Sequence, residues 1–230
     1  MAEAAPFSCF VTGTDTGVGK TLIAAALLRA QAASGLRVCG MKPVAAGAQW
    51  RDGAWHNEDV DAISGAGSVT VPRELTCPYL FEHALAPHLA AELAGVSMDP
   101  ARILRAYEDL RGRCDAVVVE GVGGFRVPLL PGFDTAELAR RMALPVVLVV
   151  GLRLGCLNHA ALTAEAIAAR GLRLAAWVAN RIEPGMALPQ ENLRALETLL
   201  AAPCLGCVPH LASPDAEAAR AWLDMGRLVY

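Results

Sequence analysis

The stretch VTGTDTGVGKT, residues 11–21, stands between an apolar run and an alanine-rich run near the start of the sequence. The run before it, residues 9–12, has the composition of a buried strand, and the run after Lys20 has that of a helix. A glycine loop between a strand and a helix is the setting of a phosphate-binding loop, since backbone N–H groups at a helix N-terminus then face one anion. The common form of that loop has four residues between its outer glycines, whereas five separate Gly13 from Gly19, so the match is imperfect.

The residue types inside this stretch suit a nucleotide. Gly13, Gly17 and Gly19 allow backbone N–H groups to turn toward phosphate oxygens. Lys20 can reach the outer phosphates, and the Thr21 hydroxyl can ligate magnesium. The alternative is a glycine-rich turn without a ligand, which the strand and helix on either side make the weaker interpretation.

Lysine is scarce in this sequence, which makes its two lysines informative. Of the 20 basic residues only Lys20 and Lys42 are lysines. Arginine is a broad planar fork and lysine a compact point charge, so a site built for the second shape does not accept the first. Lys42 begins KPVAAG, residues 42–47, at the end of the second predicted strand, where Pro43 stiffens the exit. We expect both lysines to be functional and Lys42 to face the phosphate site; the alternative for Lys42 is a surface lysine whose stem covers apolar residues.

Apolar runs that alternate with helical segments indicate an α/β fold. The predicted strands are Cys9–Thr12, Arg37–Val44, Ala116–Glu120, Pro145–Val150, Leu174–Asn180 and Cys204–Pro209. The predicted helices are Lys20–Ser34, Pro100–Gly112, Asp134–Met142, Asn158–Arg170, Pro189–Ala201 and Pro214–Met225. Continuously apolar strands separated by such helices are typical of a mostly parallel sheet with helices on both faces. We expect one domain, residues 1–230, in which the irregular segment Ala45–Pro100, with two short helices, belongs to the active site at the carboxyl ends of the strands.

Charge and hydropathy narrow the range of partners. The net charge of −3 gives no attraction to nucleic acid or to an anionic membrane surface, so we expect neither as a partner. Leu144–Leu152, the longest strongly apolar stretch, is too short to span a bilayer, and the initial MAEAAPF lacks the pattern of a secretion signal. The seven cysteines are an odd number, and all but Cys204 and Cys207 are scattered singly, which argues against a disulfide framework. These features predict a cytoplasmic protein that acts on small molecules.

Two acidic stretches supply candidate metal ligands. VVVEGVGG, residues 117–124, ends a predicted strand in Glu120, followed by glycines that allow close approach to the backbone. A carboxylate there can hold magnesium directly or through water, although a solvated charge at a strand end is common. HNEDVDA, residues 56–62, places Glu58, Asp59 and Asp61 near a helix start, where acids also occur simply because they favour that helix end. The spacing alone leaves these two interpretations open.

Two further stretches have less specific patterns. GLRLGCLNHA, residues 151–160, is a glycine loop entering a helix, with Asn158 as a possible cap; its free N–H groups could also bind a carboxylate. Cys204 and Cys207, with His210 beyond them, could suggest zinc or redox chemistry. Because no second ligand pair accompanies them, we expect small buried cysteines in a strand instead.

Taken together, the motifs resemble one family, the dethiobiotin synthetases. The resemblance covers nearly the whole chain and depends on eight stretches in order: VTGTDTGVGKT, MKPVAAG, NEDVDA, APHLAAE, VVVEGVGG, GLRLGCLNHAALT, WVANRI and GCVPHL. In that family the phosphate loop has five residues between its outer glycines, which accounts for the gap between Gly13 and Gly19. The resemblance implies a P-loop NTPase-like single domain and a homodimer with the substrate site at the subunit interface.

The resemblance also assigns roles to residues. It makes Lys42 and Lys20 catalytic, and Thr21, Asp59 and Glu120 ligands of Mg²⁺, which favours the functional interpretation of Asp59. It implies ATP binding by Gly17, Val18, Gly19, Lys20, Thr21, Leu22, Asp59, Glu120, Gly121, Val122, Gly123, Asn180, Arg181, Pro209, His210 and Leu211. It implies substrate binding by Thr16, Lys42, Ala46, Gly155, Cys156, Leu157 and Asn158, the last four taking the substrate carboxylate from the other subunit.

Two positions depart from the family pattern. Ala46 stands where members often carry serine or threonine, whose hydroxyl contacts the substrate, so this contact must be missing or replaced. Gly17 stands where some members have an acid, a change that should affect the loop more than the reaction class.

The implied reaction is the ATP-dependent closure of the ureido ring of dethiobiotin. One amine of 7,8-diaminopelargonate captures CO₂ as a carbamate, ATP phosphorylates the carbamate to a mixed anhydride, and the second amine closes the ring. ADP and phosphate are released, and no covalent enzyme intermediate is needed. Lys20, Lys42 and magnesium would neutralise the anionic groups.

Two rival functions share parts of this pattern. Switch ATPases of the partitioning type share the fold but usually carry an extra lysine early in the loop, where this chain has Asp15. ATP-dependent amidating enzymes of the cobyrinate type need a glutaminase domain in addition, and 230 residues are too few to hold one.

Overall fold

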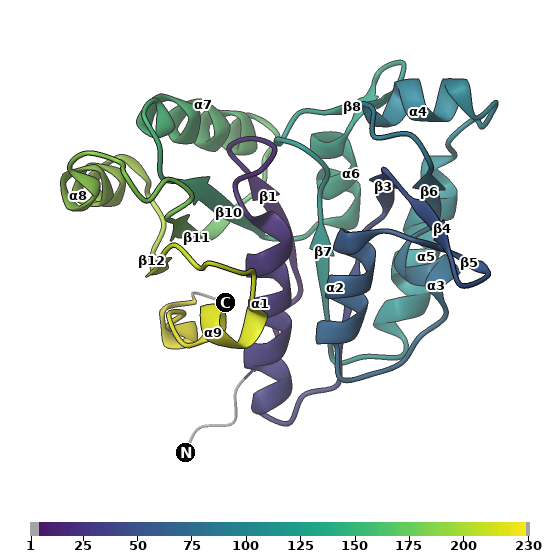
Figure 1. Cartoon of the computed structure of the whole chain (residues 1–230), viewed down its shortest axis with the longest axis horizontal. Helices are drawn as coiled ribbons and strands as arrows, with labels where there is room; N and C mark the ends of the chain where they lie inside the picture. The colour runs from purple at the N-terminus through teal and green to yellow at the C-terminus, as the bar shows by residue number, and fades with distance from the viewer. Residues whose placement is uncertain (1–4, 229–230) are drawn as a thin grey trace.

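Six parallel strands form the central sheet of this computed structural model, which describes residues 5–228 (Figure 1). Their order across the sheet is β12-β11-β10-β1-β7-β2. The strands are β1 (Cys9–Gly13), β2 (Val38–Met41), β7 (Ala116–Glu120), β10 (Val146–Gly151), β11 (Leu174–Asn180) and β12 (Cys204–Val208). All neighbouring strands pair in parallel, which confirms the predicted α/β class. Residues 1–4 and 229–230, the ends of the predicted domain, lie outside the described residues.

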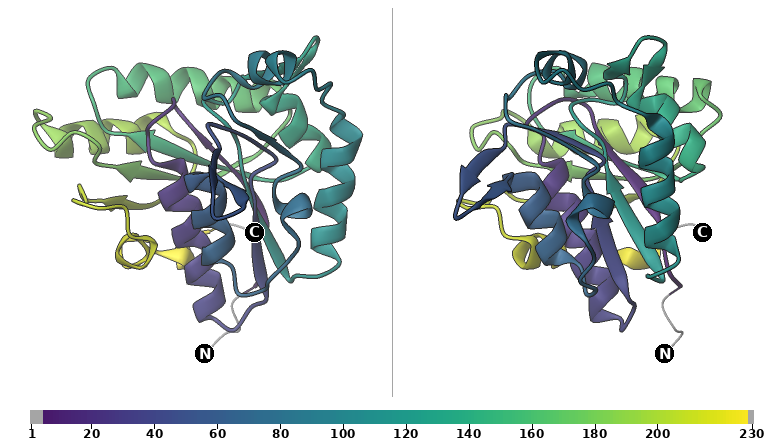
Figure 2. Two further views of the ribbon diagram at one scale, coloured as in Figure 1. Left: turned by 45° about the vertical axis from the view of Figure 1, so that its right-hand side comes forward. Right: turned by 90° about the vertical axis from the view of Figure 1, so that its right-hand side faces the viewer.

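Helices cover both faces of this sheet because successive residues of each strand point to opposite sides (Figure 2). Val147 and Val149 of β10 pack in one cluster, and Leu148 and Val150 pack in another on the opposite side. The first face is covered by α1 (Lys20–Ala33), α2 (Glu58–Ala66) and α9 (Ala216–Arg220). The second face is covered by α5 (Pro100–Arg111), α6 (Thr135–Met142), α7 (Cys156–Ala169) and α8 (Pro189–Leu199). Every residue of β1, β2, β7 and β10 is therefore buried, as the continuous apolar runs predict, whereas β12 at the edge is partly exposed.

The predicted strand Arg37–Val44 is in fact two strands in different sheets. β2 ends at Met41, and β3 (Val44–Ala46) pairs in parallel with β6 (Tyr79–Phe81) in a separate two-stranded sheet. Pro43 lies at the break, where it cannot donate a backbone hydrogen bond. The backbone N–H of Lys42 instead donates to the carbonyl of Thr76, at 2.8 Å. The break turns the chain at Lys42, so that this lysine lies at the end of the central sheet.

The irregular segment 45–100 contains more structure than predicted. It holds the helices α2, α3 (Arg73–Thr76) and α4 (Pro87–Leu93), where two short helices were expected, and a hairpin of β4 (Gln49–Arg51) and β5 (Ala54–His56). Asp52 and Gly53 form the tip of the hairpin with φ of 52° and 79°. A second short hairpin, β8 (Pro128–Leu130) with β9 (Phe133–Asp134), follows β7. These strands are two or three residues long, too short for hydrophobic alternation to reveal them.

The predicted helix Pro214–Met225 is wrong in extent. α9 covers only Ala216–Arg220, and a 3₁₀ helix, η1, covers Met225–Arg227. Between them the backbone N–H of Asp224 donates to the carbonyl of Leu205 in β12, at 2.8 Å. This hydrogen bond draws the chain back toward the sheet, so that one continuous helix cannot form. Within residues 5–228, no helix combines the length and the apolar character that crossing a membrane requires.

Candidate active site

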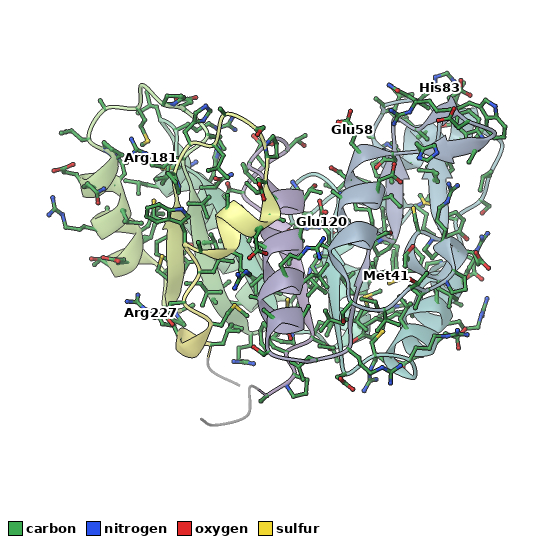
Figure 3. All side chains as sticks on the ribbon, turned by 60° about the horizontal axis from the view of Figure 1, so that its bottom comes forward. Met41, Glu58, His83, Glu120, Arg181 and Arg227 are labelled. Carbon is green, nitrogen blue, oxygen red and sulfur yellow. The ribbon has the colours of Figure 1, made fainter. Side chains whose placement is uncertain are left out.

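A cavity of about 840 Å³ opens at the carboxyl ends of β1, β2 and β7. This volume lies in the range of small-molecule sites, and the position is the one expected for a parallel sheet. The predicted site residues that line the cavity are Thr16, Gly17, Gly19, Lys20, Thr21, Lys42, Ala46, Asp59, Glu120, Val122 and Gly123. Figure 3 labels Glu120 in the middle of the molecule, near α1 and α2. Segments more than a hundred residues apart in the sequence therefore meet in one cavity.

The loop between β1 and α1 has the conformation that its glycines allow. Gly17 and Gly19 have φ of 75° and 89°, in the left-handed region where other residues are strained. A Cβ on Gly19 would lie 2.2 Å from Nδ2 of Asn180, which in turn donates to the carbonyl of Val18 at 3.0 Å. Asn180 of β11 thus supports the loop from behind, and this contact requires glycine at position 19.

Lys20 begins α1 and points back over the loop. Its ammonium donates to the carbonyl oxygen of Asp15 at 2.8 Å, and the residue is buried. Burial lowers the pKa of Lys20 to about 8, although the carboxylate of Glu120 opposes the shift. The lysine is thus held at the cavity by a neutral carbonyl, a partner that an anionic phosphate can replace.

Lys42 connects the two acidic stretches predicted from the sequence. Its Nζ lies 2.6 Å from Oε1 of Glu120 and 2.9 Å from Oδ2 of Asp59, with both lysine and glutamate side chains almost fully buried. The Thr21 hydroxyl lies 2.7 Å from Oδ1 of Asp59 and 3.0 Å from Oε1 of Glu120. These four residues, which we call the carboxylate–lysine cluster, come from α1, β2, α2 and β7 or their ends.

Burial and the neighbouring charges together set the pKa values of Lys42, Asp59 and Glu120. Burial favours the neutral form of Lys42, but the carboxylates of Glu120 and Asp59 outweigh it and raise the pKa of Lys42. Burial disfavours the ionised form of Asp59, but Lys42 outweighs it, so the pKa of Asp59 is lowered. Complete burial raises the pKa of Glu120 against the opposing charge of Lys42. The ammonium therefore stays charged between two carboxyl groups of different acidity.

Asn57 is a residue of the site that the sequence analysis did not single out. Its side-chain oxygen caps α2 by accepting from the N–H of Val60 at 3.2 Å, and its Nδ2 donates to the carbonyl of Ala46 at 3.1 Å. These bonds fix Asp59 in the first turn of α2 and hold it beside Ala46 at the cavity. Glu58 is exposed at the same helix end. The capping pattern of an asparagine before three acids was a usable signal.

Asp15 and Arg153 form a second contact absent from the predicted site. The guanidinium of Arg153, after β10, pairs with Oδ2 of Asp15, and Oδ1 of Asp15 accepts from the N–H of Thr16 at 2.7 Å. This backbone bond, with the nearby Arg153, lowers the pKa of Asp15. No local pattern predicts the pair, because 138 residues separate its members.

The predicted carboxylate-binding residues Gly155, Cys156, Leu157 and Asn158 lie outside this cavity. Asn158 is not the cap of α7, contrary to prediction: the helix begins at Cys156, and the capping position is Gly155 with φ of 92°. That left-handed glycine turns the chain into the helix two residues earlier than expected. No side chain caps this helix end, and Leu154 just before it is 95% exposed.

The remaining predicted nucleotide residues do not line the cavity. Asn180 pairs with Val208 across β11 and β12, and the backbone N–H of Arg181 donates to the carbonyl of Val208 at 3.0 Å. Figure 3 labels Arg181 to the left of α1, on the half of the molecule that holds β11 and β12. The others outside the wall are Val18, Leu22, Gly121, Pro209, His210 and Leu211.

Cys204 and Cys207 lie in β12 as predicted. Cys204 is buried and Cys207 half-buried, and burial raises the pKa of both thiols. In the part of the chain that the structure describes, no three histidine, cysteine, aspartate or glutamate side chains are grouped to hold a metal ion.

Comparison with known proteins gives relatives over nearly the full length. The matching family model, AAA_26, is described as an AAA domain and matches residues 8–218. A protein of Janthinobacterium sp. (strain Marseille) named ATP-dependent dethiobiotin synthetase BioD is 57% identical over 97% of each chain. Its namesake in Ralstonia nicotianae (strain ATCC BAA-1114 / GMI1000) is 53% identical, also over 97% of each chain.

Solved structures with the same architecture are more distant in sequence. The MinC:MinD cell division protein complex of Aquifex aeolicus matches 90% of this chain and 82% of its own, with 20% identity and a TM-score of 0.55. A ParA family ATPase of Chlorobium tepidum TLS matches 95% of this chain and 91% of its own, with 14% identity and a TM-score of 0.55. At such identities the likeness concerns the fold alone.

Proposed function

The chain belongs to the family of ATP-dependent dethiobiotin synthetases, and we propose that the cavity closes the ureido ring of dethiobiotin from 7,8-diaminopelargonate, CO₂ and ATP. The observation that carries this proposal is the carboxylate–lysine cluster beside the phosphate loop. It joins a charged lysine, two carboxyl groups and a hydroxyl, in reach of one another, at the start of α1, a helix end that no side chain caps. Phosphoryl transfer to a carbamate requires such a set of groups.

The donor set fits Mg²⁺. Thr21, Asp59 and Glu120 offer oxygen atoms, and Oε2 of Glu120 is buried without a hydrogen-bond partner among residues 5–228. Magnesium is commonly bound by one or two carboxylates together with substrate phosphates and water, so three protein oxygens suffice. These residues would hold the ion, and its charge would stabilise the phosphates of ATP.

The chain's own residues bind and neutralise the reacting groups. One amine nitrogen forms a bond to the carbon of CO₂ and loses a proton, and a carbamate oxygen then takes the γ-phosphoryl group as its bond to ADP breaks. The second amine attacks the same carbon, phosphate leaves, and a second proton is lost. Lys42 is charged and fixed close to Asp59, where it can bind the carbamate, and Lys20 can bind the transferred phosphoryl group.

The wall of the cavity suits the rest of the substrate. Apolar residues also line the cavity, namely Leu85, Pro87, Val122 and Val127. They can cover the hydrocarbon chain of diaminopelargonate, which gains free energy when it leaves water. Thr16 supplies a hydroxyl at the same cavity, and Ala46 supplies none, so Thr16 is our candidate for the missing contact.

A homodimer would give a role to Gly155–Asn158, the predicted carboxylate-binding residues outside the cavity. The start of α7 is uncapped and follows the exposed Leu154, so it can receive a carboxylate from a substrate bound in another subunit. Asn180 and Arg181, which contact Val208, and Pro209–Leu211, which follow it in the chain, are our candidates for the adenine site. A cytoplasmic location agrees with cysteines that are all free.

One assay tests the proposed function. Purified protein with ATP and Mg²⁺ should release ADP and form dethiobiotin only when diaminopelargonate and bicarbonate, the source of CO₂, are both present. Each substrate is omitted in turn as the control. Turnover of ATP that ignores both substrates would overturn the proposal and favour a switch ATPase.

A further inference from the structure

Arg153 lies outside the cavity wall but contacts the phosphate loop. It follows β10, and its guanidinium pairs with the carboxylate of Asp15, which does line the cavity. We propose that Arg153 is a positioning residue for ATP binding, which holds and neutralises Asp15 so that the phosphate loop accepts an anionic nucleotide. The inference rests on the proposed nucleotide site.

Asp15 connects Arg153 to two other residues of the phosphate loop. Its Oδ1 accepts from the N–H of Thr16 at 2.7 Å, its Oδ2 pairs with Arg153, and its carbonyl oxygen accepts from Nζ of Lys20 at 2.8 Å. Asp15 therefore contacts Arg153 through its side chain and Lys20 through its backbone carbonyl. A shift of Asp15 would move the carbonyl that holds Lys20.

The backbone that carries Arg153 is fixed, so the arginine can act as an anchor. β10 pairs with β1 up to Gly13 and Val149, and the N–H of Thr14 donates to the carbonyl of Val149 at 3.0 Å. On the other side of Arg153, its carbonyl accepts from the N–H of Cys156 at the start of α7, at 3.1 Å. Arg153 is therefore on fixed backbone, and Asp15 in the phosphate loop is the member of the ion pair that can move.

The ion pair of Arg153 with Asp15 also affects the electrostatics of the cavity. Asp15 is a carboxylate in the wall of a cavity proposed to bind the phosphates of ATP, and two anions in one site repel each other. Arg153 is the charged group that contacts this carboxylate, while His159 of α7 acts on it from farther away. Removal of the arginine would leave the carboxylate without a cation in contact with it, and the affinity for ATP would fall.

This account predicts rescue by a second substitution. Arg153→Met should weaken ATP binding about fivefold, near the upper end of what a partly exposed ion pair contributes. Asp15→Asn keeps an oxygen for the N–H of Thr16 and removes the charge that repels ATP, but its amide cannot pair with Arg153 as the carboxylate does. Its affinity for ATP should therefore fall, but less than that of Arg153→Met. The double variant should return to the affinity of Asp15→Asn, because no carboxylate remains to repel the nucleotide.

The experiment is a calorimetric titration of each full-length variant with ATP and Mg²⁺, without diaminopelargonate, alongside thermal unfolding. Arg153→Lys should keep most of the affinity. Arg105→Met is the matched control, because Arg105 pairs with Asp99 at 3.3 Å on the exposed side of α5, and it should not change ATP binding.

The outcomes separate this inference from the proposed function. If wild type fails to bind ATP, the proposed nucleotide site itself is wrong. If wild type binds but Arg153→Met binds equally well, or if the double variant is as weak as Arg153→Met, the positioning role of Arg153 is overturned. A loss of affinity that only accompanies unfolding at the assay temperature would also overturn it.

Discussion

The ammonium of Lys42 lies 2.6 Å from Oε1 of Glu120, and both side chains are buried, at 4% and 0% exposure. A buried ion pair is costly to break from one side, since the remaining charge then has no partner. Lys42 also contacts Asp59, at 2.9 Å. The lysine proposed to bind the carbamate is thus, without ligands, the counterion of the two carboxyl groups proposed to bind metal.

Lys42→Met should abolish turnover while sparing much of the ATP affinity. Loss of a group that stabilises charge in the transition state commonly costs ~10²-fold or more in rate. The variant should also unfold at lower temperature, because breaking a buried pair costs about 3–5 kcal/mol unless Glu120 takes up a proton.

Lys20→Met, by contrast, should weaken both ATP binding and turnover. Steady-state rates and ATP titrations of the two variants check this, and equal mild effects would contradict the assigned roles.

Divalent ions should bind the nucleotide-free protein more tightly when Lys42 is absent. The ammonium sits between Asp59 and Glu120, so a cation must compete with it for the same carboxylate oxygens. We expect Lys42→Met to bind Mn²⁺, a stand-in for Mg²⁺, about tenfold or more tightly than wild type. Electron paramagnetic resonance of free Mn²⁺ measures this without turnover. Glu120→Gln should weaken the binding, and an unchanged affinity in Lys42→Met would show that the ion binds elsewhere.

Gly19→Ala should lose ATP binding and stability, and Gly35→Ala is its matched control. Both glycines have a left-handed φ, 89° and 85°, but a Cβ at Gly19 would meet Asn180 at 2.2 Å, whereas nothing lies within 4 Å of one at Gly35. Gly35→Ala therefore measures the backbone strain alone, about 1 kcal/mol. Gly19→Ala should cost more and should displace the loop. Thermal unfolding and ATP titration distinguish the two, and similar losses would mean that the contact with Asn180 is unimportant.

Asn57→Ala should weaken both α2 and the site. It removes a helix cap, which costs about 0.5–2 kcal/mol, and the bond to the carbonyl of Ala46. Asn57→Asp keeps the capping oxygen and loses only the donor. The alanine variant should therefore have the lower unfolding temperature, while both variants should bind Mn²⁺ less well in the presence of ATP. Wild-type binding in both would exclude a role for Asn57 in placing Asp59.

The free energy of unfolding should depend on pH through the carboxyl group of Glu137. Hydrogen bonds from Arg140 and Arg141 lower the pKa of Glu137 from 4.5 to about 2. A lowered carboxyl pKa stabilises the fold fully above pH 4.5, and the contribution disappears as the pH falls through about 2. Glu137→Gln should thus lower the unfolding temperature at pH 6, and the difference from wild type should shrink toward pH 2. Glu191→Gln, at an exposed carboxylate with one arginine partner, should show a smaller difference at pH 6. A constant difference for Glu137→Gln would contradict the assignment.

The sequence by itself determined the fold class and the motifs that meet in the cavity. Apolar runs mark the six strands of the central sheet, because a strand buried on both faces has no polar positions to interrupt it. The glycines before Lys20 and the scarcity of lysine singled out the phosphate loop and Lys42 without any structure. These patterns can be recognised in short segments, because the apolar content of a segment indicates whether it is buried.

Tertiary structure alone decided which charges are paired at the cavity. Lys42 and Glu120 are 78 residues apart, and Asp15 and Arg153 are 138 apart, so no periodicity connects either pair. The break at Pro43, the β4–β5 hairpin and the return of the chain at Asp224 also escaped the sequence, because each depends on backbone bonds to distant segments or on strands too short to form a pattern. An ion pair depends on distance through space, and the order of the strands in the sheet sets that distance.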